Sequence, residues 1–250
     1  MSEHFMLDGA AVAFAPGQTV MQAAHAAGHY IPHLCWSPEL APHGSCRLCT
    51  VSIGGQLAAA CTTPAAAGLE VESRSAELTE RRRALLQLLF VEGNHFCPAC
   101  EKSGNCTLQA TAYEMGMLAP HFDHFFPDRQ VDASHPDVLI DFNRCILCEL
   151  CVRASRDLDG KDVFAVAGRG LQSHLLVNGA SGRLADTAFS ASDRAAGICP
   201  VGAIVRKRVG FAQPIGHREY DRHRIGDAPG EAAGEAAGEA PRDPTWSTAR

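Results

Sequence analysis

The residues of this chain best suited to bind iron are three cysteines with two residues between neighbours, followed far downstream by a Cys-Pro pair. Cys145, Cys148 and Cys151 form a CxxCxxC run, and Cys199 directly precedes Pro200. This pattern is typical of a [4Fe–4S] cluster, with three thiolates from one tight loop and the fourth from elsewhere. Zinc is the alternative, although zinc ribbons usually carry two separated CxxC pairs.

A second group of four cysteines lies near the start of the chain. Cys35, Cys46, Cys49 and Cys61 combine a long first gap with a CxxC pair and a distant fourth cysteine. Plant-type [2Fe–2S] sites have the related pattern C-x4-C-x2-C…C, so this group predicts a [2Fe–2S] cluster. A structural zinc ion is again the alternative reading of a single CxxC pair.

The third group contains only three cysteines, namely Cys97, Cys100 and Cys106. His95 is the nearest candidate for a fourth ligand, because a neutral imidazole can bind iron. We therefore expect a second [4Fe–4S] cluster with one histidine ligand, which should raise its potential relative to an all-thiolate cluster. The three groups use all 11 cysteines of the chain, which favours metal binding over core packing.

Composition narrows the class of protein further. The chain has 250 residues, 46% of them hydrophobic, and a net charge of -6, so it lacks the basic footprint of a nucleic-acid-binding protein. No secretory signal opens the sequence, and no apolar run is long enough to span a membrane. We therefore expect a cytoplasmic location, where cysteines serve as metal ligands rather than in disulfides.

The order of local patterns predicts an α+β fold that begins with a β-grasp ferredoxin-like domain over residues 1–75. Apolar runs at 5–7 and 11–14 flank an Asp-Gly turn, and a helix over 20–27 can be capped by Thr19. Further strands are expected at 50–53, 57–61 and 69–72. A hairpin, a helix and later strands follow one another in this way in [2Fe–2S] ferredoxins.

Three more regions follow. Residues 76–120 predict a small helical domain around the middle cluster, and its first helix, 76–91, should bury leucines and expose the arginines at 81–83. Residues 121–226 predict a bacterial-ferredoxin-like [4Fe–4S] domain, entered by a connecting loop at 121–136 and interrupted by a hairpin between 162 and 177. Gly-Glu-Ala repeats from 227 to 250 predict a disordered tail.

No catalytic residue is indicated. The sequence lacks a nucleophile–base motif, GxGxxG, a Walker motif and a flavin fingerprint. Iron–sulfur clusters without other reactive groups predict an electron carrier whose donor and acceptor lie on other subunits. The sequence leaves the order of the clusters open. The [2Fe–2S] cluster is either part of the main electron-transfer route or a side station next to it.

A family resemblance is carried by residues 30–35, 44–49, 92–109, 144–153, 198–203 and 214–220. In these segments the chain resembles the diaphorase small (gamma) subunit of cytoplasmic NAD-reducing [NiFe] hydrogenases, and more loosely the N-terminal part of the complex I large iron–sulfur subunit. Complex I subunits of this kind continue into a long further domain, so the length of this chain favours the hydrogenase subunit. Complex I relatives place the ligand histidine as H-x3-C, whereas here it stands as H-x-C.

The resemblance implies partners and a reaction. A diaphorase large subunit would carry FMN and bind NAD, and the large and small [NiFe] hydrogenase subunits would react with H2, with electrons crossing this chain between them. An equivalent subunit of a NAD-dependent formate dehydrogenase or of a complex I-like NADH oxidoreductase is the first alternative. Two functions of different classes also fit the cysteine pattern, namely a free ferredoxin-like carrier and a zinc-stabilised interaction module.

Overall fold

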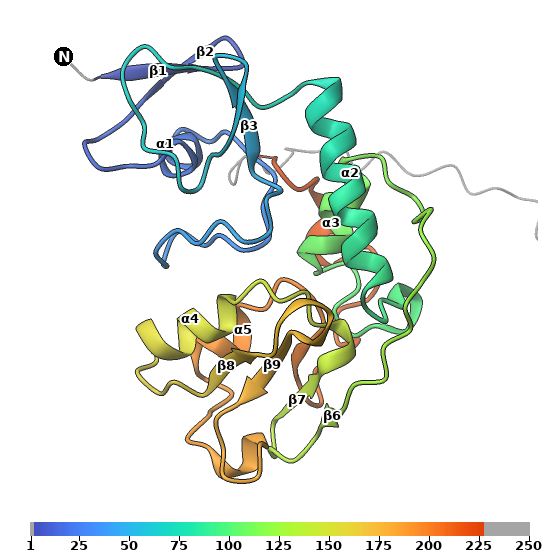
Figure 1. Ribbon diagram of the computed structural model, residues 1–250. Helices are drawn as coiled ribbons and strands as arrows, with labels where there is room; N and C mark the ends of the chain where they lie inside the picture. Colours follow the sequence, from blue (N-terminus) through green and yellow to red (C-terminus); the bar gives the residue numbers. More distant parts are fainter. Residues whose placement is uncertain (1–2, 228–250) are drawn as a thin grey trace, which may run out of the picture.

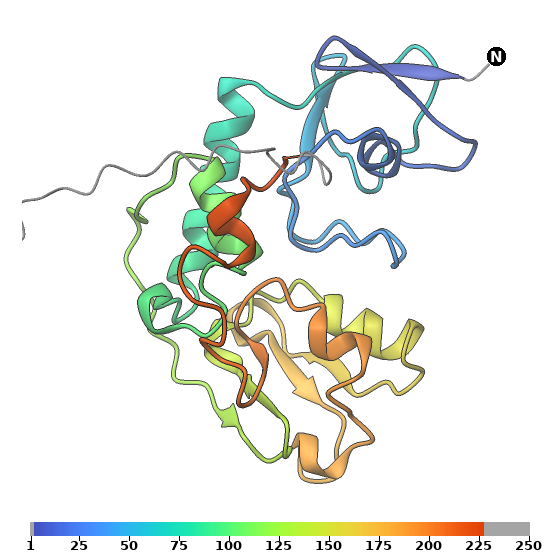
Figure 2. The same cartoon turned by 180° about the vertical axis from the view of Figure 1, so that it is seen from behind.

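The computed structural model describes residues 3–227 and contains three parts (Figures 1 and 2). A sheet domain formed by the first part of the chain lies at one end, and a mixed domain lies at the other. Two helices, α2 (Ala76–Val91) and α3 (Thr107–Glu114), lie along one side between them. Residues 228–250, which hold nearly all of the predicted disordered tail, are outside the described part of the chain.

The N-terminal domain has the predicted hairpin, helix and later strands. Its five-stranded sheet has the order β2-β1-β5-β3-β4, in which β1 and β5 are parallel and the other pairs antiparallel. This mixed sheet with one helix is the expected β-grasp arrangement. The elements are β1 (His4–Leu7), β2 (Ala10–Ala13), α1 (Val20–Ala26), β3 (Thr50–Ile53), β4 (Gln56–Ala59) and β5 (Glu70–Glu72).

Local sequence signals explain the ends of these elements. Asp8 and Gly9 both have positive φ in the hairpin turn, and the Asp8 carboxylate accepts hydrogen bonds from the backbone and side chain of Ser73. Thr19 caps α1 in a capping box with Gln22, so two otherwise free N–H groups are satisfied. The turn and the cap therefore form where the sequence predicts them.

Helix α2 matches the expected bounds, but the prediction that all its arginines are exposed is wrong. Arg82 is only 3% exposed, and its guanidinium donates to the backbone carbonyls of Leu48, Thr50 and Ser73. Leu88, expected inside, is 41% exposed. Periodicity failed at Arg82 because this part of the helix packs against loop carbonyls, which need hydrogen-bond donors, rather than against an apolar surface.

The C-terminal domain contains two small sheets and two short helices. The predicted hairpin is present, whereas the loop expected at 121–136 also supplies a short strand, β6, to the sheet β10-β7-β6. The strands are β6 (Val131–Asp132), β7 (Val138–Asp141), β8 (Phe164–Ala167), β9 (His174–Val177) and β10 (Ile204–Arg206). The helices are α4 (Leu150–Asp157) and α5 (Arg194–Gly197). A last helix, α6 (Glu219–Arg222), lies beside α3 (Figure 2), and the backbone N–H of Tyr220 donates to the Gly104 carbonyl over 2.9 Å.

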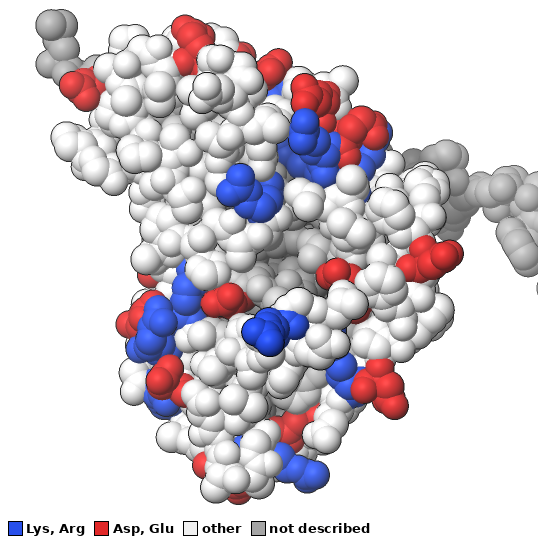
Figure 3. Space-filling model, viewed as in Figure 1, with Lys and Arg blue, Asp and Glu red and all other residues white. Residues whose placement is uncertain are grey.

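Four 3-10 turns complete the described chain: η1 (Cys97–Ala99), η2 (Phe142–Arg144), η3 (Gly170–Gln172) and η4 (Leu184–Asp186). Within residues 3–227 no helix is both long and apolar enough to cross a membrane. Charged side chains of both signs are scattered over the face in Figure 3 rather than gathered into a patch of one sign.

Two hydrophobic cores organise the molecule. One lies inside the N-terminal domain and includes Phe5 and Val51. The other extends over α2, α3 and the C-terminal domain, and it also takes in Leu34, Cys35 and Leu48 from the first cysteine loop. The loop that carries the first cysteine group therefore packs against the C-terminal domain as well as its own sheet.

Candidate iron–sulfur centres

The four cysteines of the first group lie together as two pairs. The Cys49 thiol donates to the Cys61 sulfur over 3.3 Å, and the backbone N–H of Cys46 donates to Cys35 Sγ over 3.4 Å. Arg47, inside the CxxC loop, has a positive φ of 58°, a strained conformation for a side chain of its size. The long gap after Cys35 is thus closed by the tertiary fold.

The middle group lines a single small cavity. Cys97, Cys100 and Cys106 share its wall with His95, and Arg144 of the C-terminal domain completes one side. Cys97 lies in turn η1 and Cys106 directly precedes α3, so a helix start and a 3-10 turn set the directions of the thiols. The structure therefore brings together the four residues that the sequence proposed for this site.

His95 has the environment of a metal-binding imidazole. Its Nε2 atom is buried and has no hydrogen-bond partner. Burial, together with the nearby positive charge of Arg144, lowers the pKa of the ring to about 4, and the negative charge of Asp141 opposes this only in part. The ring is therefore neutral at ordinary pH, and a buried nitrogen without a partner, on a residue that lines the same cavity as three thiols, fits a missing ligand.

The unusual spacing of this histidine has a structural explanation. The H-x3-C position corresponds to Gly93, and a Cβ atom built there would lie 2.6 Å from His95 Nε2. The imidazole of His95 therefore occupies the space into which a side chain at 93 would extend. Because Gly93 leaves that space free, a histidine two residues later reaches the same region of the cavity.

The C-terminal group also lines one cavity, formed by Cys145, Cys148, Cys151 and Cys199. Leu147 and Glu149, which alternate with these cysteines, have φ values of 52° and 58°. Such alternation turns successive backbone N–H groups inward and creates a concavity suited to an anion. The sequence identifies the cysteines but gives no direct sign of this strained backbone.

Burial makes ionisation of the free cysteines to thiolates unfavourable. It raises the pKa of Cys106 to about 12 and that of Cys145 to about 11, while the backbone N–H groups of Leu108 and Leu147 act in the opposite direction. Bound iron would supply the positive charge that these thiolates require. Within residues 3–227 no three His, Cys, Asp or Glu side chains lie close enough together to bind a single metal ion. An iron–sulfur cluster does not require this, because its ligands bind at separate corners of the cluster.

The C-terminal group adjoins the first group through Arg153 on α4. Its Nη1 donates to the carbonyl of Ala41 over 2.8 Å and its Nη2 to the carbonyl of Cys35 over 2.5 Å. Both acceptors belong to the loop of the first cysteine group. We call this contact the first junction.

On its other side the C-terminal group adjoins the middle group, in what we call the second junction. The Pro200 carbonyl accepts from the backbone of Thr107 over 2.9 Å and from the Cys106 thiol over 3.6 Å. Arg144 Nη1 lies 3.7 Å from Cys100 Sγ. A Cβ built on Gly202 would lie 2.7 Å from the same sulfur, so a glycine is needed for this approach.

Through the two junctions the C-terminal group contacts both of the others, although it is last in the sequence. Arg144, Arg153 and Gly202 form these contacts, and the sequence patterns did not single out any of them for this role. In the sequence, each of them lies within three residues of a ligand cysteine.

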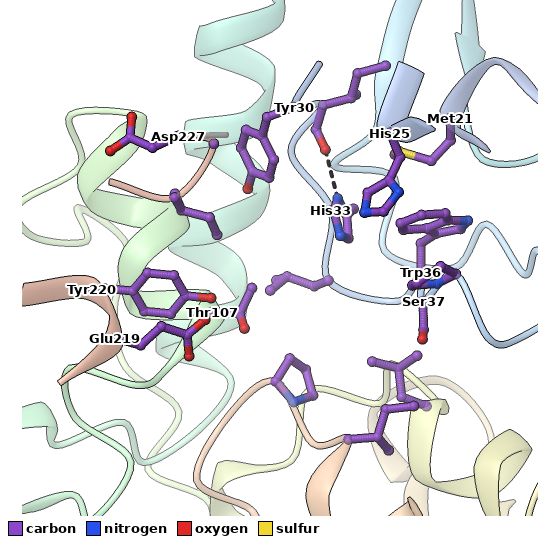
Figure 4. A pocket seen from close by; sticks show the side chains of 18 of the residues that line it. Met21, His25, Tyr30, His33, Trp36, Ser37, Thr107, Glu219, Tyr220 and Asp227 are labelled. Carbon is purple, nitrogen blue, oxygen red and sulfur yellow. Dashed lines mark hydrogen bonds between the residues drawn. The ribbon is translucent and has the colours of Figure 1, made fainter. Parts of the chain in front are cut away.

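A large cavity opens where the three parts of the chain meet (Figure 4). His25, His33 and Trp36 gather on one side, and Thr107 and Tyr220 lie on the opposite side. The lining also includes Leu34 and Cys199, so loops from all three cysteine groups contribute to it. The sequence did not predict this cavity, because its walls come from distant segments.

Comparison with sequence-family profiles identifies three iron–sulfur regions. A 2Fe-2S iron-sulfur cluster binding domain matches residues 3–76, an NADH-ubiquinone oxidoreductase-G iron-sulfur binding region matches 82–121, and a 4Fe-4S single cluster domain matches 138–206. With the folds described above, these matches define an α+β iron–sulfur protein of the electron-transfer class.

The chain belongs to the family of gamma subunits of NAD-reducing hydrogenases. It is 40% identical to the NAD-reducing hydrogenase HoxS subunit gamma of Cupriavidus necator, over 88% of this chain and 94% of that one. It also matches a chain in the crystal structure of an NAD+-reducing [NiFe]-hydrogenase in the H2-reduced state. That match has a TM-score of 0.89 and 58% identity, and it covers 92% of this chain and 97% of that one.

Other oxidoreductase relatives are more distant, as expected. The NADPH-Fe(3+) oxidoreductase subunit alpha of Geobacter sulfurreducens is 31% identical, and the match covers 82% of this chain but 24% of that protein. The NADH-quinone oxidoreductase subunit 3 of Thermus thermophilus is 30% identical over 76% of this chain and 28% of its own length. Both expected resemblances, to the hydrogenase gamma subunit and to complex I, are thus confirmed.

Proposed function

We propose that this chain carries electrons between a [NiFe] hydrogenase module and an FMN-containing diaphorase subunit that binds NAD, in a reaction that converts H2 and NAD+ to NADH and a proton. The single observation that carries the proposal is the similarity over nearly the full length to the gamma subunit of an NAD-reducing hydrogenase. The diaphorase large subunit and the hydrogenase large and small subunits are the proposed partners, in the cytoplasm.

The proposal includes the cofactors and their ligands. One [2Fe–2S] cluster is assigned to Cys35, Cys46, Cys49 and Cys61, and two [4Fe–4S] clusters are assigned to His95, Cys97, Cys100 and Cys106 and to Cys145, Cys148, Cys151 and Cys199. The proposed domains are residues 1–75, 76–120 and 121–226. When bound, such clusters supply reversible one-electron transfer at potentials that net charge, hydrogen bonds and burial determine.

The residues of this chain have three roles in that function. The cysteines and His95 provide ligands at fixed positions, and the buried cores exclude water from the cavities that they line. The two junctions hold the ligand loops in the spatial order first, C-terminal, middle. The junction contacts favour a route in this order, in which the [2Fe–2S] site is part of the line rather than a side station.

An equivalent role beside a NAD-dependent formate dehydrogenase or a complex I-like oxidoreductase remains the alternative. The oxidoreductase relatives keep the latter open, because their matches cover 82% and 76% of this chain. Which catalytic subunit accompanies the chain distinguishes these functions.

The experiment is an anaerobic purification of the native complex, assayed for NAD reduction with H2 and, separately, with formate. We expect reduction with H2 and none with formate. About ten irons for each copy of this chain would agree with one [2Fe–2S] and two [4Fe–4S] clusters, once the iron of co-purifying subunits is subtracted. NAD reduction with formate alone, or a colourless chain containing zinc, would contradict the proposal.

A further inference from the structure

Arg153 is a buried charge with no carboxylate beside it. The residue is 5% exposed, and the two hydrogen bonds that it donates go to the neutral backbone carbonyls of Ala41 and Cys35. Its Nε is buried and lacks any partner. Within the described chain, none of the ion pairs involves Arg153.

The acidic groups nearest along α4 are already engaged elsewhere. Glu149, one turn before Arg153, lies 3.3 Å from His43, and Asp157, one turn after it, pairs with Arg156 at 2.7 Å. Arg82, another buried arginine of the described chain, donates from all three nitrogens to carbonyls. Burial of an unpaired charge is unfavourable, so the environment of Arg153 calls for a negative partner.

The direction of the side chain identifies that partner. Successive residues of an α-helix are rotated by about 100°, so Arg153 leaves α4 on the face opposite to Cys151. It therefore extends away from the C-terminal cavity and toward the loop of the first cysteine group, where it holds the carbonyl of the ligand residue Cys35. An iron–sulfur cluster with four thiolates is anionic and becomes more so on reduction.

We propose that Arg153 is the counter-charge of the [2Fe–2S] cluster assigned to the first cysteine group, and that it raises the reduction potential of that cluster. The inference rests on the proposed function, because it requires the cluster to be present. Arg153 acts on the cluster from a different domain, so docking of the C-terminal domain tunes the potential of the N-terminal one. It is a positioning and tuning residue rather than a ligand.

The test is a redox titration of the anaerobically purified holoprotein, followed by electron paramagnetic resonance of the reduced [2Fe–2S] cluster. Removal of the charge in Arg153→Gln should lower the ratio of reduced to oxidised [2Fe–2S] cluster about tenfold at a fixed potential, or about 59 mV for a one-electron couple. Arg153→Lys keeps the charge and should remain close to the wild type. Arg156→Gln, an exposed arginine on the same helix, is the matched control and should change nothing.

The outcomes separate this inference from the proposed function. A wild-type protein without a [2Fe–2S] signal would overturn the cluster assignment itself. A signal that is present in Arg153→Gln at an unchanged potential would overturn only the role of Arg153. If the glutamine variant loses the cluster, Arg153→Lys decides: a retained potential supports the counter-charge, and a lowered potential contradicts it.

Discussion

The two junctions on either side of the C-terminal cysteine group each contain an arginine, but the two arginines have different surroundings. Arg144 at the second junction forms ion pairs with Glu101 at 2.7 Å and with Asp141 at 2.9 Å. Arg153 at the first junction has carbonyl partners only. One positive charge is thus balanced by carboxylates, and the other is not.

This difference separates two ways of joining iron–sulfur domains. Burial alone would lower the pKa of Arg144, yet its hydrogen bond with Glu101 and the surrounding negative charges raise it above the ordinary value. The second junction is therefore an ionic clamp, in which Glu101 and Asp141 balance the charge of Arg144. The same two carboxylates reduce the electrostatic effect of Arg144 on Cys100. The first junction is electrostatically incomplete until an anionic group is bound nearby.

Loss of the centre that both junctions share should have the largest effect. In Cys148→Ala the C-terminal cluster lacks a ligand, so we expect its signal to disappear and H2-driven NAD reduction to fall to the assay background. The signals of the other two clusters should persist, because their ligands are untouched. Activity near the wild-type level would show that electrons do not pass through the C-terminal site.

The middle cluster alone should respond to His95→Ala. The variant removes the orphaned buried nitrogen, so we expect this cluster to be lost or converted while the other two signals persist in electron paramagnetic resonance. His95→Cys is the control, because it restores a fourth ligand and should retain a cluster at a lower potential. Survival of all three signals unchanged in His95→Ala would refute the ligand assignment.

A smaller effect is expected when the clamp at the second junction is altered. Arg144→Gln should lower the potential of the middle cluster by less than about 59 mV, since Glu101 and Asp141 already offset much of the charge. Glu101→Gln should shift the same potential upward, because it leaves Arg144 less neutralised. Redox titration of both variants checks the comparison, and shifts of the same sign would contradict it.

The smallest effect should come from the close approach of Gly202 to Cys100. Gly202→Ala places a methyl group 2.7 Å from the sulfur, and we expect a loss of about 1–3 kcal/mol as the second junction adjusts. A thermal melt would show this as roughly 2–4 °C for each kcal/mol. In the control Gly197→Ala the new methyl meets nothing nearer than 3.8 Å, so its melting temperature should not fall.

Local sequence signals predicted much of the fold. The Asp-Gly turn, the Thr19 cap, helix α2 and the hairpin of β8 and β9 depend on neighbouring residues, so they form where those residues stand. The prediction that Arg82 is exposed was wrong. Its burial depends on three carbonyls from other segments, which no helical periodicity within α2 can indicate.

The sequence by itself determined which residues could bind iron, because cysteine spacing within a loop is a covalent property of the chain. It also pointed to His95 through a count of ligands, although not to the space that Gly93 leaves for the imidazole. Tertiary structure alone decided which cysteine groups adjoin one another and which charges lie between them. Those depend on contacts between segments about a hundred residues apart, such as Arg153 with Cys35, which only the packing of separate domains creates.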